Sequence, residues 1–320
     1  MFIAQAYNAK HDFWRYLIGS VIIAAASFIG QVPLIVAIIY KTVQDGMNVD
    51  LLDESALFTI LEPNTFLFLI LISFVVAFIA LKLLLKTLHG QNLRAIATSR
   101  NKLDWKRIWF AFIFWGIISS GLTLIDYFYL SPEGYEFNFE PQRFLILLVI
   151  AVALIPIQTS LEEYVFRGYL MQGFGMLAKN RWFPLVMTSV IFGCLHLANP
   201  EIEKLGYGLL MYYIGTGLFL GIITLMDEGI ELALGFHAAN NLFTALLVTS
   251  DWTAFQTHSI LKDVAEPELS FIDMVLPVFI IFPIIIFIFS KVYHWRNWKE
   301  KLFGEIHEPP TEDYKVIGES

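Results

Sequence analysis

Three ionisable residues, Glu162, Glu163 and Arg167, lie close together in the segment 161–168. The apolar run 144–157 comes shortly before them, which places these charges in or near a bilayer. An uncompensated charge at the centre of a membrane helix costs roughly 3 kcal/mol on insertion scales. Three charges within six residues therefore indicate a functional site.

Two histidines and an asparagine lie on other apolar segments. Of the seven histidines, only His196 and His237 fall within predicted membrane spans. Asn241 is four residues after His237, so the two side chains share one face of a helix. One intramembrane histidine fits a hydrogen-bonded packing role as well as a catalytic one. Two histidines, two glutamates and an asparagine on three neighbouring spans favour a common site.

The two glutamates have different helical partners. Glu163 and Arg167 have the order and the i,i+4 spacing that favour an ion pair on a helix. Glu162 points about 100° away from Glu163 on the same helix. It is therefore free to hold a water molecule and suits the work of a general base. The alternative is a structural network of ion pairs without catalysis.

A turn near Lys179 predicts how two of these segments meet. The apolar segments before and after it are expected to form a helical hairpin. Glu162 is seventeen residues before Lys179, and His196 is seventeen residues after it. Since both helices rise by ~1.5 Å per residue, we expect the two side chains at the same depth.

The composition is that of a membrane protein. The chain has 57% hydrophobic and 16% charged residues, 29 phenylalanines and a mean hydropathy of +0.64. Its 21 lysines and arginines are spread around helix ends, which excludes a nucleic-acid-binding domain. The single cysteine, Cys194, excludes an internal disulfide and a cysteine-rich metal site.

The fold class predicted from this pattern is all-α: a polytopic membrane helical bundle of about eight transmembrane helices. The predicted spans are 14–40, 65–85, 108–130, 144–177, 182–197, 205–226, 230–248 and 271–293. Prolines inside these spans are expected to kink helices rather than end them. We expect one transmembrane helical domain over 1–298 with a catalytic core at about 143–250, followed by a flexible cytoplasmic tail over 299–320.

Basic residues predict the orientation. With eight spans, sixteen of the 21 lysines and arginines fall on the side that also holds both termini. Four fall on the opposite side, and Arg167 is intramembrane. Both termini are therefore predicted to be cytoplasmic.

Three short motifs occur in a fixed order on separate spans: Glu162-Glu163-x-x-x-Arg167, then Phe192-x-x-x-His196, then His237-x-x-x-Asn241. Together they resemble the CPBP family, which includes the type II CAAX prenyl endopeptidases and the bacterial Abi proteins. The resemblance covers about residues 158–247, and the flanking spans match only in being hydrophobic.

The resemblance implies an intramembrane endopeptidase that uses a glutamate-activated water. Carried over, Glu162 activates the water and His196 assists it, while His237 and Asn241 stabilise the oxyanion. Glu163 and Arg167 are supporting residues. No metal or other cofactor is expected. A zinc metalloprotease is the alternative, because two histidines and a glutamate form a valid catalytic zinc set.

The implied partners are the lipid bilayer and a membrane-associated peptide or protein substrate, reached through a cavity that faces the cytoplasm. The compact form is similar to bacterial members, so the expected location is the bacterial inner (cell) membrane. Two other functions remain open from the residues. One is a transporter with a buried Glu/His proton relay, and the other is a non-catalytic membrane immunity or binding protein.

Overall fold

Apolar runs of sufficient length form helices, because a backbone in hydrocarbon must satisfy its own hydrogen bonds. The computed structural model describes residues 2–46, 60–268 and 270–308. Within these residues, six helices are long and apolar enough to cross a bilayer. They cover Phe13–Gln44, Pro63–His89, Trp105–Leu130, Pro141–Ala178, Tyr207–Asp227 and Met274–Val292. The predicted polytopic helical bundle is confirmed.

The predicted number of eight spanning helices is not confirmed. The fifth predicted span is the shorter apolar helix Trp182–Ala198. The seventh is α11 (Glu231–Leu247), which has 17 residues and carries several polar side chains. Both helices belong to the bundle, but their length and composition do not mark them as membrane spans.

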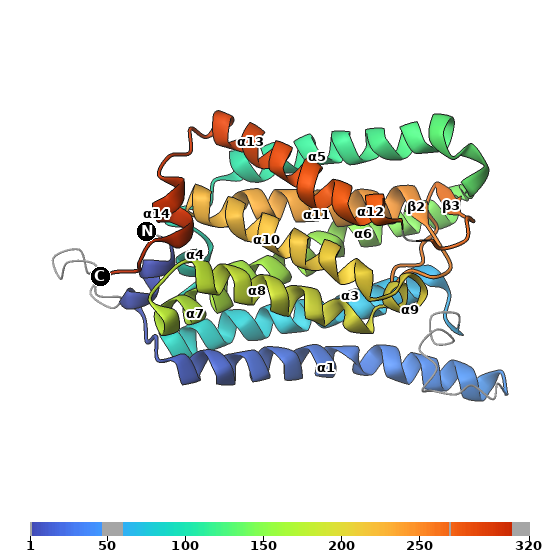
Figure 1. The fold of residues 1–320 in the computed structure, drawn as a ribbon. Coiled ribbons are helices and arrows are strands. Elements are labelled where there is room, and N and C mark those ends of the chain that lie inside the picture. The colour runs from blue at the N-terminus through green and yellow to red at the C-terminus, as the bar shows by residue number, and fades with distance from the viewer. Residues whose placement is uncertain (1, 47–59, 269, 309–320) are drawn as a thin grey trace.

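Figure 1 shows how the helices and strands are arranged in the bundle. The α-helices are α1 (Phe13–Gln44), α3 (Pro63–Leu84), α4 (Leu93–Ala97), α5 (Trp105–Ile125), α6 (Pro141–Glu163), α7 (Met171–Ala178), α8 (Trp182–Cys194), α9 (Pro200–Leu205), α10 (Leu210–Asp227), α12 (Phe271–Leu276), α13 (Phe282–Val292) and α14 (Trp298–Phe303). The 3₁₀ and π-helical turns are η1 (Ile3–Asn8), η2 (Leu85–His89), η3 (Asp126–Leu130), η4 (Pro132–Gly134), η5 (Tyr164–Leu170), η6 (Leu195–Ala198), η7 (Tyr207–Leu209) and η8 (Pro277–Ile281). The strands are β1 (Tyr135–Phe137), β2 (Val248–Thr249) and β3 (Leu261–Asp263).

The helices pack side by side with close backbone contacts. α3 packs between α1 and α6, α11 packs against both α5 and α6, and α10 packs against α8. Gly235 of α11 lies directly against the carbonyl oxygen of Ile108 on α5, where an added Cβ would collide. Small residues at such contacts let membrane helices approach closely. Pro33 and Pro156 lie inside α1 and α6, as expected.

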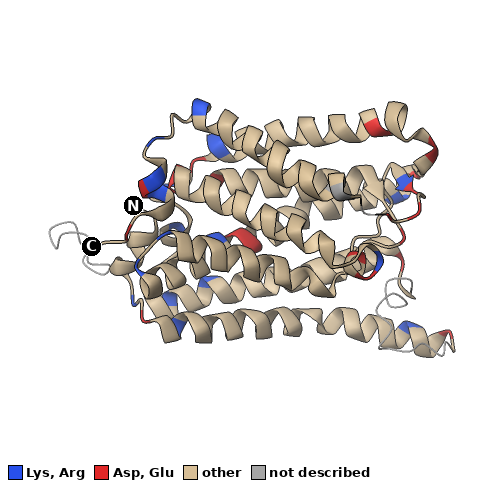
Figure 2. Ribbon diagram, in the orientation of Figure 1, with Lys and Arg blue, Asp and Glu red and all other residues tan. Residues whose placement is uncertain are grey.

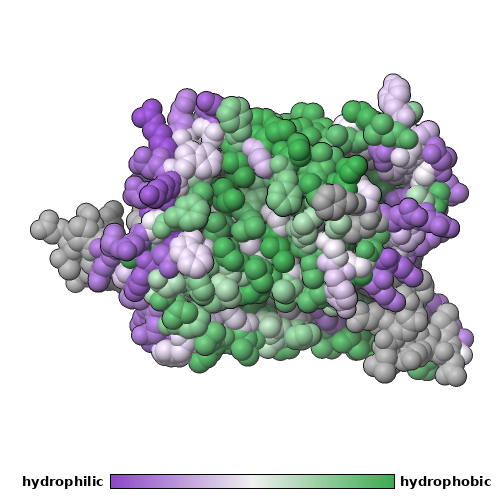
Figure 3. All heavy atoms as spheres, in the orientation of Figure 1, coloured by the Kyte–Doolittle hydropathy of each residue, from purple (hydrophilic) through white to green (hydrophobic). Residues whose placement is uncertain are grey.

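The surface divides into an apolar belt and two polar ends. Large apolar side chains face outward along the helices, including Phe28 on α1, Ile117 on α5 and Val149 on α6. Figure 3 shows this belt between two hydrophilic ends. Charged residues gather at those ends, apart from a small group inside the bundle (Figure 2). This is the surface expected of a protein that spans a bilayer.

The two ends of the bundle differ in structure. The "termini end" comprises η1, α4, α14 and the α7–α8 and α10–α11 turns, so the first and last described segments of the chain lie there (Figure 1). The "sheet end" comprises α9 and the strands in the order β1-β3-β2, with β1 antiparallel and β2 parallel to β3. The predicted turn at Lys179 is present, with φ of 55° at that residue.

Part of the predicted tail belongs to the folded body. The chain forms α14 at Trp298–Phe303, and Ile306 is only 3% exposed. The amide of Ile306 donates to the carbonyl of Lys179 in the α7–α8 turn. Residues 299–306 are therefore packed on the bundle because an apolar side chain and backbone hydrogen bonds hold them. Residues 309–320 of the predicted tail lie outside the described residues.

Candidate active site

The two adjacent glutamates end α6, and a π-helical turn follows them. η5 continues the same rod over Tyr164–Leu170, and π-helical turns occur frequently at functional sites. Gly168 in this turn lies against the carbonyl oxygen of Ile96, and an added Cβ would be 2.7 Å from that oxygen. The close contact with α4 fixes the part of the rod that carries Arg167.

Glu163 and Arg167 form the predicted ion pair. Arg167 Nη1 lies 2.9 Å from Glu163 Oε1, and both side chains are fully buried. Arg167 also donates to the carbonyl of Gly217 on α10 and lies over the ring of Phe192, 4.4 Å from its centroid. Glu163 is thus an inaccessible carboxylate with a charged partner, and Arg167 links this part of the rod to α8 and α10.

His237 lies between the two carboxylates. Its Nδ1 is 2.7 Å from Glu163 Oε1, and its Nε2 is 3.6 Å from Glu162 Oε2. An ionised carboxylate only accepts hydrogen bonds, so Nδ1 carries the proton that is donated to Glu163. Such a carboxylate partner fixes both the tautomer and the ring orientation of a histidine. The buried carboxylate, Glu163, therefore orients the His237 ring toward Glu162.

Glu162 belongs to a chain of amide hydrogen bonds. Gln158 donates from Nε2 to Glu162 Oε1 at 2.6 Å, and Asn241 donates from Nδ2 to Gln158 Oε1 at 3.2 Å. Asn240 donates to Asn241 Oδ1 and accepts from the indole of Trp115 on α5. One oxygen of Glu162 is therefore held in place, while its side chain keeps 19% exposure.

His196 lies apart from this cluster. Its Nδ1 is 2.8 Å from the carbonyl oxygen of Phe192, and its ring stacks on Tyr213 with 4.1 Å between centroids. The ring of Phe192 is 4.8 Å from that of His196 and 6.1 Å from that of His237. For these described side chains, no hydrogen bond or ion pair joins His196 directly to Glu162. His196 was predicted to lie at the same depth as Glu162, and the ring of Phe192 is what connects it to the cluster.

A network at the termini end fixes the start of α11. Arg100 reaches Asp227 at 2.8 Å and Glu231 at 3.1 Å, and Arg107 reaches Asp227 at 2.9 Å. Asp104, outside the membrane spans, also binds Arg107. Burial raises the pKa of Asp104, but the hydrogen bond and charge of Arg107 together with the backbone amides of Lys106 and Arg107 outweigh it, so the pKa lies below its usual value. These contacts tie the segment before α5 to the helix that carries His237.

Sequence reasoning missed four residues around the candidate site. Gln158 had a signal, because it lies four residues before Glu162 and so shares its helix face. Asn240 is next to Asn241 in sequence, but no spacing argument pointed to it. Trp115 and Tyr213 gave no signal in the sequence, since an aromatic residue in an apolar span is ordinary packing in a membrane helix.

The predicted zinc alternative does not fit this arrangement. Over the residues that the structure describes, no group of three or more His, Cys, Asp or Glu side chains is arranged to hold a metal ion. Glu163 Oε1 already binds Arg167 and His237, and the adjacent guanidinium opposes a cation there. His196 is directed to Phe192 and Tyr213 instead of toward the other two ligands.

Comparisons with known proteins agree with the predicted resemblance. The model of the family described as "Type II CAAX prenyl endopeptidase Rce1-like" matches residues 141–243. This segment runs from α6 into α11 and contains all six predicted site residues. The uncharacterized protein YyaK of Bacillus subtilis (strain 168) is 32% identical over 243 residues, which cover 76% of this chain and 80% of that protein. No solved structure matches the chain. The chain therefore belongs to the type II CAAX prenyl endopeptidase Rce1-like family of membrane proteases.

Proposed function

We propose that this protein hydrolyses a peptide bond of a membrane-associated protein or peptide with a water molecule that Glu162 activates. One observation carries this proposal: the adjacent carboxylates have opposite environments. Glu163 is fully buried and paired with Arg167, whereas Glu162 is 19% exposed and bound to an amide. Glu162 is therefore the carboxylate that water reaches, and a general base must contact the proton that it removes.

The proposed reaction needs no covalent intermediate. The water oxygen attacks the carbonyl carbon of the scissile bond while its proton passes to Glu162. The carbonyl oxygen becomes an oxyanion, which accepts hydrogen bonds from the second amide proton of Asn241 and from Nε2 of a His237 ring that carries both protons. When the carbon–nitrogen bond breaks, Glu162 returns the proton to the leaving amine. One oxyanion donor contributes about 3 kcal/mol to lowering the barrier in well-studied hydrolases.

The geometry of the histidines supports separate roles. A carbonyl oxygen only accepts, so His196 donates from Nδ1 to Phe192 and keeps Nε2 as an acceptor. An acceptor suits the positioning of a water molecule. His237 donates from Nδ1 to Glu163, so it donates from Nε2 as well only when both ring nitrogens carry a proton.

We place the protein in the bacterial cell membrane with both termini in the cytoplasm. The distribution of lysine and arginine supports this orientation, because basic residues of the predicted cytoplasmic connections lie at the termini end. Lys102, Lys106 and Arg181 are examples.

The deciding experiment is cleavage of a membrane-inserted peptide by the purified protein in nanodiscs. We expect cleavage by the wild-type protein and none by Glu162→Gln. A proton-relay transporter would instead show proton or solute flux in proteoliposomes that depends on Glu162. A binding protein would retain the peptide unchanged in both variants.

A further inference from the structure

A line of hydrogen bonds runs from α5 through α11 to α6 and ends at Glu162. The indole Nε1 of Trp115 donates to Asn240 Oδ1 at 3.0 Å, and Asn240 Nδ2 donates to Asn241 Oδ1 at 3.2 Å. Asn241 Nδ2 donates to Gln158 Oε1 at 3.2 Å, and Gln158 Nε2 donates to Glu162 Oε1 at 2.6 Å. We call these side chains the amide chain. Because each member donates to the next, the amide chain has one direction.

The two ends of the amide chain both set this direction. An indole N–H only donates, and an ionised carboxylate only accepts. A side-chain amide does both, because its oxygen accepts and its NH₂ group donates, and a half-turn of the amide exchanges the two groups. The amides of Asn240, Asn241 and Gln158 therefore take their orientation from Trp115 and Glu162.

The direction matters for the proposed reaction at Asn241. In the observed direction, Asn241 turns its oxygen to Asn240 and its NH₂ group to Gln158, which leaves its second amide proton for the proposed oxyanion. In the reversed direction, the oxygen of Asn241 takes the place of the NH₂ group. The oxyanion then meets a lone pair instead of a donor. The direction of the amide chain thus decides whether Asn241 stabilises the oxyanion.

One end of the amide chain changes during the proposed reaction. When Glu162 takes the proton of the water, it becomes a carboxylic acid, which donates as well as accepts. It then no longer requires Gln158 to donate, and its own O–H is able to reverse the amide chain. Trp115 remains a donor throughout. Reversal would turn the NH₂ group of Asn240 against the buried indole N–H, and a buried donor without an acceptor is unfavourable.

The packing of α5 against α11 holds the indole of Trp115 in place. Gly235 of α11 lies directly against the backbone of α5, and Gly116 of α5 lies against the ring of Phe243 on α11. These two close contacts flank the hydrogen bond of the indole along both helices. Trp115 also stacks on Phe236, with 4.5 Å between ring centroids. The position and the orientation of its N–H are therefore fixed by the helix pair.

We propose that Trp115 is a positioning residue that keeps the amide chain in one direction while Glu162 is protonated. Asn241 then remains an oxyanion donor until the proton passes to the leaving amine. This inference rests on the proposed protease function. Trp115 lies on α5, outside residues 141–243 that match the family model, and acts on the reaction only through the amide chain.

The kinetics of peptide cleavage test this role. Trp115→Phe keeps an aromatic ring between α5 and α11 and removes the donor. We expect kcat to fall about tenfold, the order expected for one hydrogen bond of a network, and KM to stay unchanged because Trp115 does not act on peptide binding. Trp109→Phe, at an exposed position of the same helix, is the matched control and should change neither constant. An unchanged kcat for Trp115→Phe would overturn the proposal.

A double variant separates this role from simple packing. Asn240→Leu keeps a similar size and interrupts the amide chain between Trp115 and Asn241. If Trp115 acts through the amide chain, Trp115→Phe/Asn240→Leu should have the kcat of Asn240→Leu alone. Two independent effects on packing would multiply instead. Losses that multiply would therefore overturn the proposal.

The indole resonance of Trp115 tests the direction without requiring activity. In protein with isotopically labelled tryptophan, nuclear magnetic resonance identifies this resonance by its absence from Trp115→Phe. In Glu162→Gln, an uncharged group that donates and accepts replaces the protonated base. We expect a hydrogen-bonded indole proton that exchanges slowly with water in the wild type and in Glu162→Gln. Asn240→Leu should move the resonance to the position of a free indole proton.

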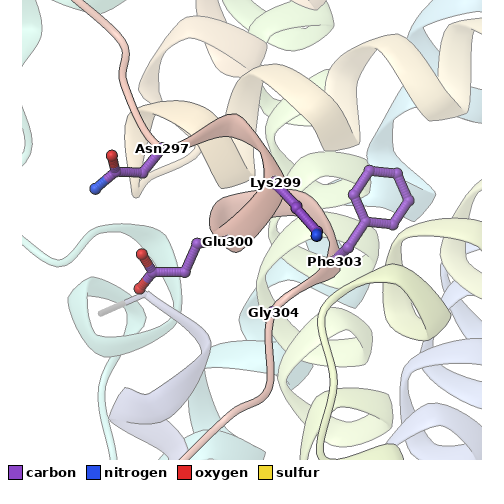
Figure 4. Close-up of a pocket in the computed structure, with 5 residues that line it drawn as sticks. All are labelled: Asn297, Lys299, Glu300, Phe303 and Gly304. Carbon is purple, nitrogen blue, oxygen red and sulfur yellow. The ribbon is translucent and has the colours of Figure 1, made fainter.

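Glu300→Gln is the control for Glu162→Gln, because it makes the same exchange outside the site. Glu300 lines a pocket of about 480 Å³ at the termini end, and that pocket includes no member of the amide chain (Figure 4). This control should leave the resonance of Trp115 unchanged. Loss of the indole hydrogen bond in Glu162→Gln would show that the amide chain reverses despite Trp115 and would overturn the proposal. If the wild-type protein cleaves no peptide, the proposed function fails while the resonance still decides whether Trp115 fixes the direction.

Discussion

Glu162 is the side chain on which the proposed chemistry depends, and it can be changed with little loss of packing. Glu162→Gln keeps the size of the residue and one hydrogen bond with Gln158 but removes the base. We expect proteolysis to fall by about 10²–10⁴-fold, while the melting temperature in detergent stays near that of the wild type. Retained activity would exclude Glu162 as the base.

Glu163 should respond differently because it is a buried ion-pair partner. Glu163→Gln leaves the guanidinium of Arg167 buried without its counter-charge, which costs about 3–5 kcal/mol. We expect lower expression and a lower melting temperature as well as lost activity. The double variant Glu163→Gln/Arg167→Met should recover stability but not activity. If the double variant were the least stable of the three, the ion-pair argument would be wrong.

Metal dependence separates the proposed mechanism from a zinc protease. Glu163 is occupied by Arg167 and His237, and His196 is directed elsewhere. We expect purified protein to contain well below one zinc per chain by elemental analysis and to keep its activity after chelation. His196→Ala should reduce activity more than Asn241→Ala, which removes one of two oxyanion donors. Activity that is lost with a chelator and restored by zinc would require a Lewis-acid mechanism.

At the scale of elements, the contact between α5 and α11 positions His237. Gly235 faces the carbonyl of Ile108 with no room for a Cβ, whereas Gly121 on α5 has nothing within 4 Å of an added Cβ. Gly235→Ala should therefore move α11, lower stability by about 1–3 kcal/mol and reduce activity. Gly121→Ala is the matched control and should leave both near wild type. Thermal unfolding and peptide cleavage measure the two effects, and similar behaviour of the two variants would contradict this role for Gly235.

At the scale of the whole molecule, the orientation follows from charge and can be measured directly. In the Cys194→Ser background, Lys102→Cys lies on the predicted cytoplasmic side and Glu133→Cys on the opposite side, and both positions are exposed. An impermeant thiol reagent should label Glu133→Cys in intact cells and label Lys102→Cys only after permeabilisation. Labelling of Lys102→Cys in intact cells would reverse the predicted orientation.

The sequence by itself determined the all-helical membrane bundle, the family and the pairing of Glu163 with Arg167. Hydropathy and i,i+4 spacing are local properties, so the order of residues along the chain is enough to predict them. It did not determine how many helices span the bilayer, because the helix Trp182–Ala198 and the 17-residue α11 are too short for their length to mark them as membrane spans.

Only the tertiary structure placed His237 between the two glutamates, linked Asn241 to Glu162 through Gln158 and stacked His196 on Tyr213. It also placed the terminal segments over the end of the bundle where the sequence suggested an open cavity. These arrangements depend on the rotation and packing of helices that are far apart in the chain. Equal residue counts from a turn fix relative depth along two helices, but they leave open which faces meet.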